Sequence, residues 1–151
     1  MRVIAGKTRT DDALRVSSER LGRLAANPEG VRVVTENWFD VTASADDVEA
    51  ILDPLEGRVG LLVDLANWTG ESKYDELARL ARYGETCHAK AEWHGDTVDE
   101  TDFRASIAAL EDNGYTGPYA LVYSGPSPDE WAGLDVLREM VVSETGRRPV
   151  V

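Results

Sequence analysis

The chain has 151 residues, of which 42% are hydrophobic and 29% charged, a composition typical of one folded soluble domain. Its formal net charge of -12 repels phosphate backbones, which argues against nucleic acid as a partner. The single cysteine excludes an internal disulfide and fits a cytoplasmic protein. We see neither a signal peptide nor an apolar run near the ~20 residues of a membrane span, so we expect no membrane partner.

The predicted elements alternate between strand and helix along the chain. In chain order they are a strand at 2–6, a helix at 13–27, a strand at 31–38, a helix at 45–57, a strand at 59–68, a helix at 73–84, a strand at 86–93, a helix at 99–114, a strand at 119–125 and a helix at 127–144. Asp11 or Asp12 is expected to cap the first helix and Ser44 the second.

The strand at 59–68, VGLLVDLANW, is apolar on consecutive positions. This pattern is typical of a strand covered on both faces, as in parallel sheets. Five strands that each precede a helix favour parallel pairing through right-handed crossovers. The sequence therefore predicts an α/β fold in a single domain over residues 1–151.

Polar side chains gather at the carboxyl ends of the predicted strands, where folds of this class collect their chemistry. Glu36 ends the second strand and Asp64 the third, while His88 and Lys90 lie two apart on the fourth and share one side. Carboxylates together with one imidazole suit Mn, Co, Fe, Mg or Zn ions. Glu36, Asp64 and His88 are therefore a candidate metal site.

Ordinary explanations exist for each of these residues taken singly. A strand-end glutamate is usually a cap or an ion-pair partner, and a lone histidine is more often a core residue. Asp64 is harder to explain in this way, because a buried carboxylate is costly unless it is paired or metal-bound. The occurrence of all three on successive strands favours the metal site.

The remaining candidates are less specific. Cys87 is expected to face away from His88 as a small core residue, and His94 lies past the strand in a predicted loop. Three tryptophans stand at or just beyond strand ends: Trp38, Trp68 and Trp93. They either pack in the core or form aromatic walls around a sugar or another small polar ligand, and the sequence leaves both open.

Four segments taken together resemble the C-terminal part of a xylose isomerase-like TIM barrel. They are VVTENW (33–38), LLVDLANW (61–68), TCHAKAEW (86–93) and GYTGPYALVYSGP (114–126). This superfamily comprises sugar isomerases and epimerases, inosose dehydratase and endonuclease IV-type enzymes. The resemblance implies a partial (β/α) TIM barrel, with five parallel βα units that correspond to the last five of the eight in a barrel of ~250 residues.

The resemblance also implies an activity, namely the divalent-metal-dependent aldose–ketose isomerisation or epimerisation of a small sugar or polyol. The metal (Mn, Co, Mg or Zn) would be held by Glu36, Asp64 and His88, with Glu36 also acting as a catalytic base. Lys90 matches a family lysine beside the substrate and is the second catalytic candidate. Asn67, where many members have a histidine, would hydrogen-bond a substrate hydroxyl.

One ligand of the family pattern is missing. Members carry a second glutamate on the last strand, but Val122 stands at that place here. Water, Tyr123 or Ser124 could fill the position without replacing a carboxylate. In the family mechanism one glutamate removes a proton beside the carbonyl and the other returns it on the opposite face. We therefore expect reduced activity.

A five-unit piece of a barrel exposes two strand edges, which invites pairing with another chain. We expect either a homo-oligomer or a partner chain that supplies the missing strands. The competing hypothesis is a non-catalytic partial-barrel binding or scaffold module that needs such a partner. An endonuclease IV-like DNA repair activity is disfavoured, because those enzymes use several histidines at a multi-zinc site and this chain has 2.

Overall fold

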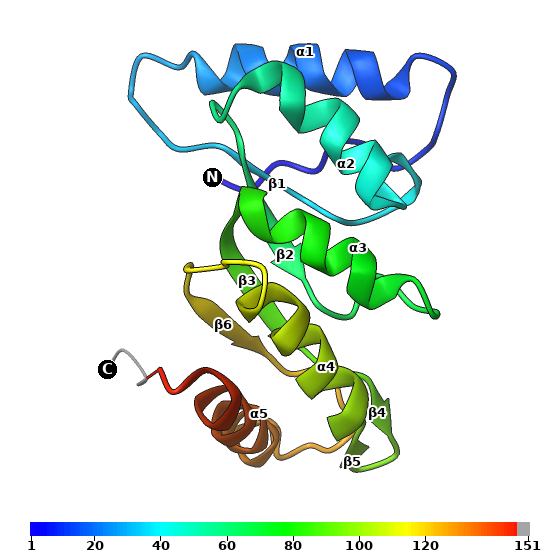
Figure 1. Ribbon diagram of the computed structural model, residues 1–151, viewed down its shortest axis with the longest axis vertical. Coiled ribbons are helices and arrows are strands. Elements are labelled where there is room, and N and C mark those ends of the chain that lie inside the picture. The colour runs from blue at the N-terminus through cyan, green and yellow to red at the C-terminus, as the bar shows by residue number, and fades with distance from the viewer. Residues whose placement is uncertain (148–151) are drawn as a thin grey trace.

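A four-stranded parallel sheet lies at the centre of the computed structural model, which describes residues 1–147 (Figure 1). Its strands are β1 (Val34–Glu36), β2 (Gly60–Asp64), β3 (Gly84–Lys90) and β6 (Tyr119–Val122). They lie in the order β1-β2-β3-β6, which is also their order along the chain. The predicted parallel α/β architecture is confirmed.

Five α-helices occur within residues 1–147: α1 (Ala13–Ala25), α2 (Ala45–Leu52), α3 (Lys73–Leu80), α4 (Glu100–Glu111) and α5 (Glu130–Thr145). Three short 3-10 turns adjoin them: η1 (Asp40–Thr42), η2 (Asp53–Leu55) and η3 (Ala81–Tyr83). The helices form a row along the sheet, in chain order (Figure 1). None of them is both long enough and apolar enough to cross a membrane.

The first predicted strand is reduced to a single bridge, so the prediction of a full strand at 2–6 is wrong. Arg2 bridges Val34 in parallel, and the amide of Val3 donates to the carbonyl of Val34 at 2.9 Å. The carbonyl of Ala5 accepts from the hydroxyl of Ser17 in α1 at 2.7 Å. This contact directs the segment toward the helix layer before a longer ladder with β1 forms.

A small hairpin was missed by the sequence reasoning. It pairs β4 (Trp93–His94) with β5 (Thr97–Val98) in antiparallel fashion. Gly95 has φ +61 at its turn, a conformation that glycine adopts without steric cost. The hairpin leads from β3 into α4.

The two predicted helix caps differ in outcome. The hydroxyl of Ser44 accepts from the amide of Asp47 at 3.3 Å, so the predicted cap of α2 is confirmed. Asp12 precedes α1, but its side chain makes no capping hydrogen bond. Its backbone, at φ -110 and ψ 5, lacks the extended geometry that aims an N-cap side chain at the helix amides. The carboxylate of Asp12 pairs with Arg15 instead.

The sheet has one face packed against the helices and one face that remains partly open. On β3, Cys87 and Ala89 are fully buried, whereas His88 and Lys90 on the alternate positions keep some exposure. Only β2, among the four sheet strands, is buried at every position, as its continuous apolar run predicts. His88 and Lys90 therefore lie on the open face, and Asp64, the register partner of His88, points to the same side.

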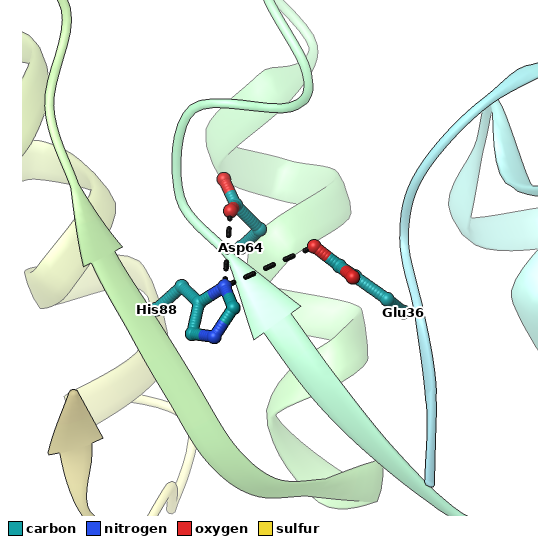
Figure 2. Close-up of side chains that lie close together, drawn as sticks. All are labelled: Glu36, Asp64 and His88. Atoms are coloured by element: carbon teal, nitrogen blue, oxygen red, sulfur yellow. Dashed lines mark ion pairs between the residues drawn. The ribbon is translucent and has the colours of Figure 1, made fainter. Parts of the chain in front are cut away.

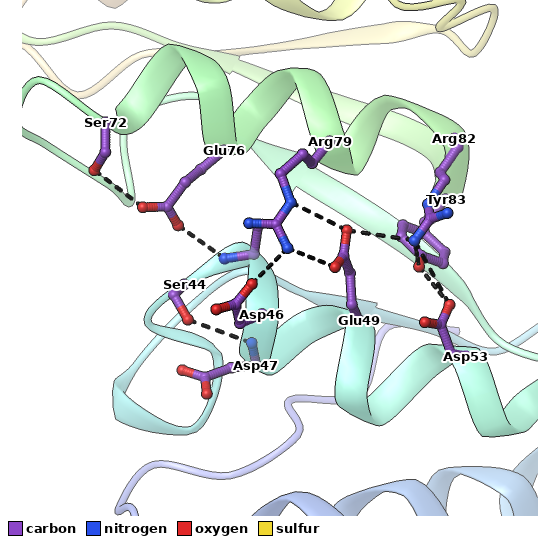
Figure 3. A network of polar contacts seen from close by, with 11 residues as sticks. Ser44, Asp46, Asp47, Glu49, Asp53, Ser72, Glu76, Arg79, Arg82 and Tyr83 are labelled. Atoms are coloured by element: carbon purple, nitrogen blue, oxygen red, sulfur yellow. Dashed lines mark hydrogen bonds and ion pairs between the residues drawn. The ribbon is translucent and has the colours of Figure 1, made fainter.

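Polar contacts join α2 to α3 on the outside of the helix layer (Figure 3). Arg79 donates to Glu49 and Asp46, and these two carboxylates raise the pKa of the guanidinium. The Oε2 atom of Glu76 accepts from the first amide of α2, on Ala45, at 2.8 Å. Beyond the carboxyl ends of the two helices, Tyr83 of η3 hydrogen-bonds Asp53 of η2. Burial and this hydrogen bond raise the pKa of Tyr83 to about 12. These contacts hold α2, which follows β1, against α3, which follows β2.

Candidate metal centre

Three side chains from successive strands converge on the open face of the sheet (Figure 2). Glu36 is the last residue of β1 and Asp64 the last of β2, while His88 is the register partner of Asp64 on β3. The Nδ1 atom of His88 lies 3.4 Å from Oδ2 of Asp64 and 3.9 Å from Oε1 of Glu36. One ligand atom from each residue lies within 4.8 Å of the other two. The proximity expected from the sequence is present.

Both carboxylates are nearly buried, with 3% of the Glu36 side chain and 4% of the Asp64 side chain exposed. Buried carboxylates require hydrogen-bond partners or a cation. One oxygen of each is bonded on the outside of the cluster: Oδ1 of Asp64 accepts from the amide of Ala66 at 2.9 Å, and Oε2 of Glu36 accepts from Arg2 at 2.9 Å. The second oxygen of each faces His88.

This donor set fits a divalent cation. Two carboxylate oxygens and one imidazole nitrogen are ligands that Mn, Co, Mg and Zn ions accept. Two atoms bound to one ion at about 2.1 Å lie roughly 3.0 to 4.2 Å apart, depending on the angle between the bonds. The separations of 3.4 Å and 3.9 Å fall within that range.

Arg2 belongs to the site, although the sequence reasoning did not assign it a role. Its Nη1 atom donates to Oε2 of Glu36, and its backbone bridge to Val34 brings it there. The contact spans 34 positions of the chain. A basic residue in a predicted strand was the only available signal, and the register against β1 could not be derived from it.

Asn37 is a second residue that the sequence reasoning left without a role. It is fully buried, and its side chain bridges the ends of β1 and β2. The amide Nδ2 donates to the carbonyl of Asp64 at 3.1 Å, and Oδ1 accepts from the amide of Asp64 at 2.7 Å. This pair of bonds sets Asp64 beside Glu36.

Asn67 and Lys90 form a hydrogen-bonded chain that ends on Glu36. Nδ2 of Asn67 donates to Oε1 of Glu36 at 3.2 Å, and Nζ of Lys90 lies 3.4 Å from Oδ1 of Asn67. Both sequence candidates therefore lie next to the three converging side chains. Asn67 also lines a neighbouring cleft of about 390 Å³ between the segments that follow β1 and β2. The other lining residues are Phe39, Asp40, Ala43, Trp68, Thr69, Ser72, Lys73 and Glu76.

The three tryptophans occupy different environments. Trp68 is 8% exposed, and its indole N–H donates to the carbonyl of Thr42 at 3.0 Å. Trp93 packs edge-on against Tyr123, with ring centroids 5.1 Å apart. Trp38 stacks on Phe39 and remains 37% exposed. Trp38 therefore offers the most free aromatic surface of the three.

The fourth strand contributes no polar side chain to this face along Tyr119–Val122. Register partners in parallel strands point to the same side, and these are Ala120 for His88 and Val122 for Lys90. The hydroxyl of Tyr123 accepts from the amide of Ser127 at 2.9 Å. The hydroxyl of Ser124 donates to a backbone carbonyl at 3.1 Å. Both hydroxyls have partners elsewhere, which argues against either as a fourth ligand.

Cys87 and His94 lie outside the site, as expected. Cys87 is fully buried on the helix side of β3, and burial raises the pKa of its thiol. His94 is exposed in the hairpin, where its Nε2 atom lies 3.4 Å from Oδ2 of Asp99. A hydrogen bond from the backbone of Asp102 is the main cause that lowers the pKa of Asp99.

The chain matches the sequence model of a known protein family. The sequence model of the family described as "Xylose isomerase-like TIM barrel" matches residues 2–140. The matched range contains the four strands of the parallel sheet, the three converging residues and most of α5. A search of curated proteins finds no match to the chain.

Proposed function

Because the chain belongs to the xylose isomerase-like TIM barrel family, we propose that it is a divalent-metal-dependent sugar isomerase- or epimerase-like protein. Its substrate would be a small sugar or polyol. The convergence of Glu36, Asp64 and His88 within 4.8 Å is the observation that carries the proposal. We expect a cytoplasmic location, as the single cysteine indicates.

We further propose that residues 1–151 form one domain, a partial barrel whose five βα units correspond to the last five of eight. Strands in sequential order with a row of helices support this interpretation. The isolated bridge between Arg2 and Val34 supports a fifth strand position beside β1, although it is not itself a strand. Residues 148–151 lie outside the described part of the chain.

The proposed roles follow from the contacts at the cluster. Glu36, Asp64 and His88 would hold the ion, which would act as a Lewis acid toward a substrate carbonyl. Oε1 of Glu36 faces the place of the ion, so Oε2, which accepts from Arg2 at 2.9 Å, would be the oxygen that takes a proton. Asn67 hydrogen-bonds Oε1 and can exchange this bond for one to a substrate hydroxyl. Lys90 would stabilise negative charge on a substrate oxygen.

A single carboxylate base favours one of the two reactions. Epimerisation requires that the proton return to the opposite face of the carbon, which calls for a second base. Along β6 the residues on this face are Ala120 and Val122, which cannot act as bases. Aldose–ketose isomerisation can proceed with one base that moves the proton along one face. Glu36 is therefore proposed as the base of an isomerase with reduced activity.

Deuterium exchange tests the proposal even when turnover is slow. Protein loaded with Mg²⁺, Mn²⁺, Co²⁺ or Zn²⁺ would be incubated with D-fructose or D-xylulose in D₂O, and mass spectrometry would measure deuterium at carbon. We expect metal-dependent incorporation that Glu36→Gln abolishes. Glu19→Gln, on the exposed side of α1, serves as the control and should retain it. Incorporation no greater than in the Glu36→Gln variant, with every metal, would contradict the proposal.

The alternative is a non-catalytic binding or scaffold module. Within residues 1–147, β6 pairs only with β3 and leaves its other edge without a partner strand. Such an edge favours a homo-oligomer or a second chain that supplies further strands. Light scattering that finds an obligate complex without exchange activity would support this alternative, whereas an active monomer would argue against it.

A further inference from the structure

Two cationic side chains flank the cluster of Glu36, Asp64 and His88. Arg2 contacts Glu36, and 43% of its side chain is exposed. Lys90 lies two residues after His88 on β3 and points to the same face. Its ammonium lies 3.4 Å from the amide oxygen of Asn67. Lys90 forms no ion pair with the described residues 1–147. Its charge is therefore available to a ligand.

The formal charges at the site are balanced only in the absence of metal. The carboxylates of Glu36 and Asp64 offset the charges of Arg2 and Lys90, while His88 is neutral when it binds metal. A divalent ion would add two positive charges to these four side chains. Excess positive charge next to two nearly buried carboxylates favours a counter-ion on the partly exposed side of the cluster. This local excess contrasts with the formal charge of -12 on the whole chain.

The side of the cluster next to β6 is apolar and partly exposed to solvent. The register places the small apolar residue Ala120 beside His88 and Val122 beside Lys90. Ala120 is exposed and Val122 is partly exposed. A group bound there would meet the ammonium of Lys90 and no protein carboxylate from β6.

We propose that the site takes a small hydroxy or keto acid, such as a sugar acid, in preference to a neutral sugar. The substrate carboxylate supplies the negative charge that β6 does not, and Lys90 is its counter-ion. A carboxylate lies directly beside a hydroxyl or carbonyl carbon, so both groups reach the cluster together. A terminal phosphate carries its charge farther from the reacting carbons. This inference rests on the proposed function, because it uses the same residues.

A matched pair of probes tests the charge preference directly. D-gluconate and sorbitol share a six-carbon hydroxylated chain, but one ends in a carboxylate where the other has a hydroxymethyl group. Calorimetry would measure their binding to Mn²⁺-loaded protein freed of unbound metal, with metal-free protein as the blank. Gluconate should bind at least about tenfold more tightly than sorbitol, in line with a fixed counter-ion. Sorbitol 6-phosphate tests whether a phosphate serves equally.

Two substitutions assign the preference to Lys90. Lys90→Gln should bring gluconate affinity to within about threefold of sorbitol affinity, since it removes the counter-ion. Arg20→Gln, an exposed change of the same charge on α1, should keep the preference. Val122→Glu retains Lys90 but sets a protein carboxylate at its register partner, so it should also weaken gluconate binding. Val122→Gln controls for size.

The results of these binding measurements distinguish a failure of the acid preference from a failure of the proposed metal-dependent function. Equal affinity for gluconate and sorbitol in metal-loaded protein would overturn the acid preference and leave the metal site intact. Tighter binding of sorbitol 6-phosphate than of gluconate would overturn the choice of a carboxylate. If the protein takes up no Mn²⁺, the proposed metal-dependent function fails, and this inference fails with it.

Discussion

The Nδ1 atom of His88 lies 3.4 Å from the Oδ2 atom of Asp64, its register partner on the adjacent parallel strand. The sheet itself produces this proximity, because register partners project from the same face. Glu36, one strand farther, completes the group through Oε1 at 3.9 Å from the same nitrogen. The three positions therefore depend on strand pairing rather than on a loop conformation.

Metal binding should stabilise the folded protein by mass action. An ion at a hundredfold excess over its Kd adds about 2.7 kcal/mol, which corresponds to a rise in Tm of roughly 5–11 °C for a domain of this size. Scanning fluorimetry with Mn²⁺ or Co²⁺ should detect the rise, and His88→Ala should abolish it. His94→Ala removes an exposed imidazole that pairs with Asp99 and should leave it unchanged. No metal-dependent shift in the unmodified chain would refute the site.

Lys73 should be far more important for stability than an exposed cation. Its side chain is 3% exposed, and its ammonium lies 2.6 and 2.8 Å from the carboxylate oxygens of Asp102. Lys73→Met leaves a partly buried carboxylate without its counter-charge, so the free energy of unfolding should fall by about 3 kcal/mol. Arg15→Met breaks an exposed pair with Glu19 and should cost below about 0.5 kcal/mol. Urea denaturation would measure both, and similar losses would count against this account.

Ser44 and Asp12 provide a matched test of helix capping. Ser44 accepts a hydrogen bond from an amide of α2, whereas Asp12 makes no such bond to α1. Ser44→Ala should lower the free energy of unfolding by about 1 kcal/mol, and Asp12→Ala by no more than a few tenths. Chemical denaturation of the two variants would measure the difference. An equal effect at both positions would mean that the cap geometry is wrong.

Cys87 should make stability fall at alkaline pH. Burial raises the pKa of its thiol, so the folded state keeps the proton while the unfolded chain loses it above about pH 8.5. The unfolded state then binds fewer protons, and the free energy of unfolding decreases as the pH rises from about 8.5 toward 10. Below that range this contribution is fully retained. Cys87→Ala should flatten the slope measured by denaturation across the window.

The burial of Cys87 also predicts that its thiol is protected from thiol reagents in the folded protein. At pH 8 the native protein should not react with a disulfide reagent such as DTNB, and one thiol per chain should appear in urea. Fast reaction of the native protein would show that β3 opens readily or that Cys87 does not face the helix layer.

Much of the fold could be predicted because its determinants are local. The continuous apolar run of β2 indicated a strand buried on both faces, and Ser44 indicated where α2 begins. Convergence of Glu36, Asp64 and His88 followed from their positions near the carboxyl ends of successive parallel strands. The bridge at Arg2 and the hairpin at Gly95 were not predicted, because each depends on contacts or turn geometry that weakly patterned segments do not reveal.

The sequence by itself determined the order of the helices and of the four strands in the parallel sheet, and which residues share a side of each strand, because these depend on periodicity within a few residues. Only the tertiary structure decided that Arg2 holds one oxygen of Glu36 while Asn67 bonds the other. It also placed Trp68 in the interior with its indole nitrogen bonded to Thr42. These contacts join residues 26 to 34 positions apart, and they depend on the register between strands and on the packing of loops. Periodicity places a side chain on a face but does not select its distant partner.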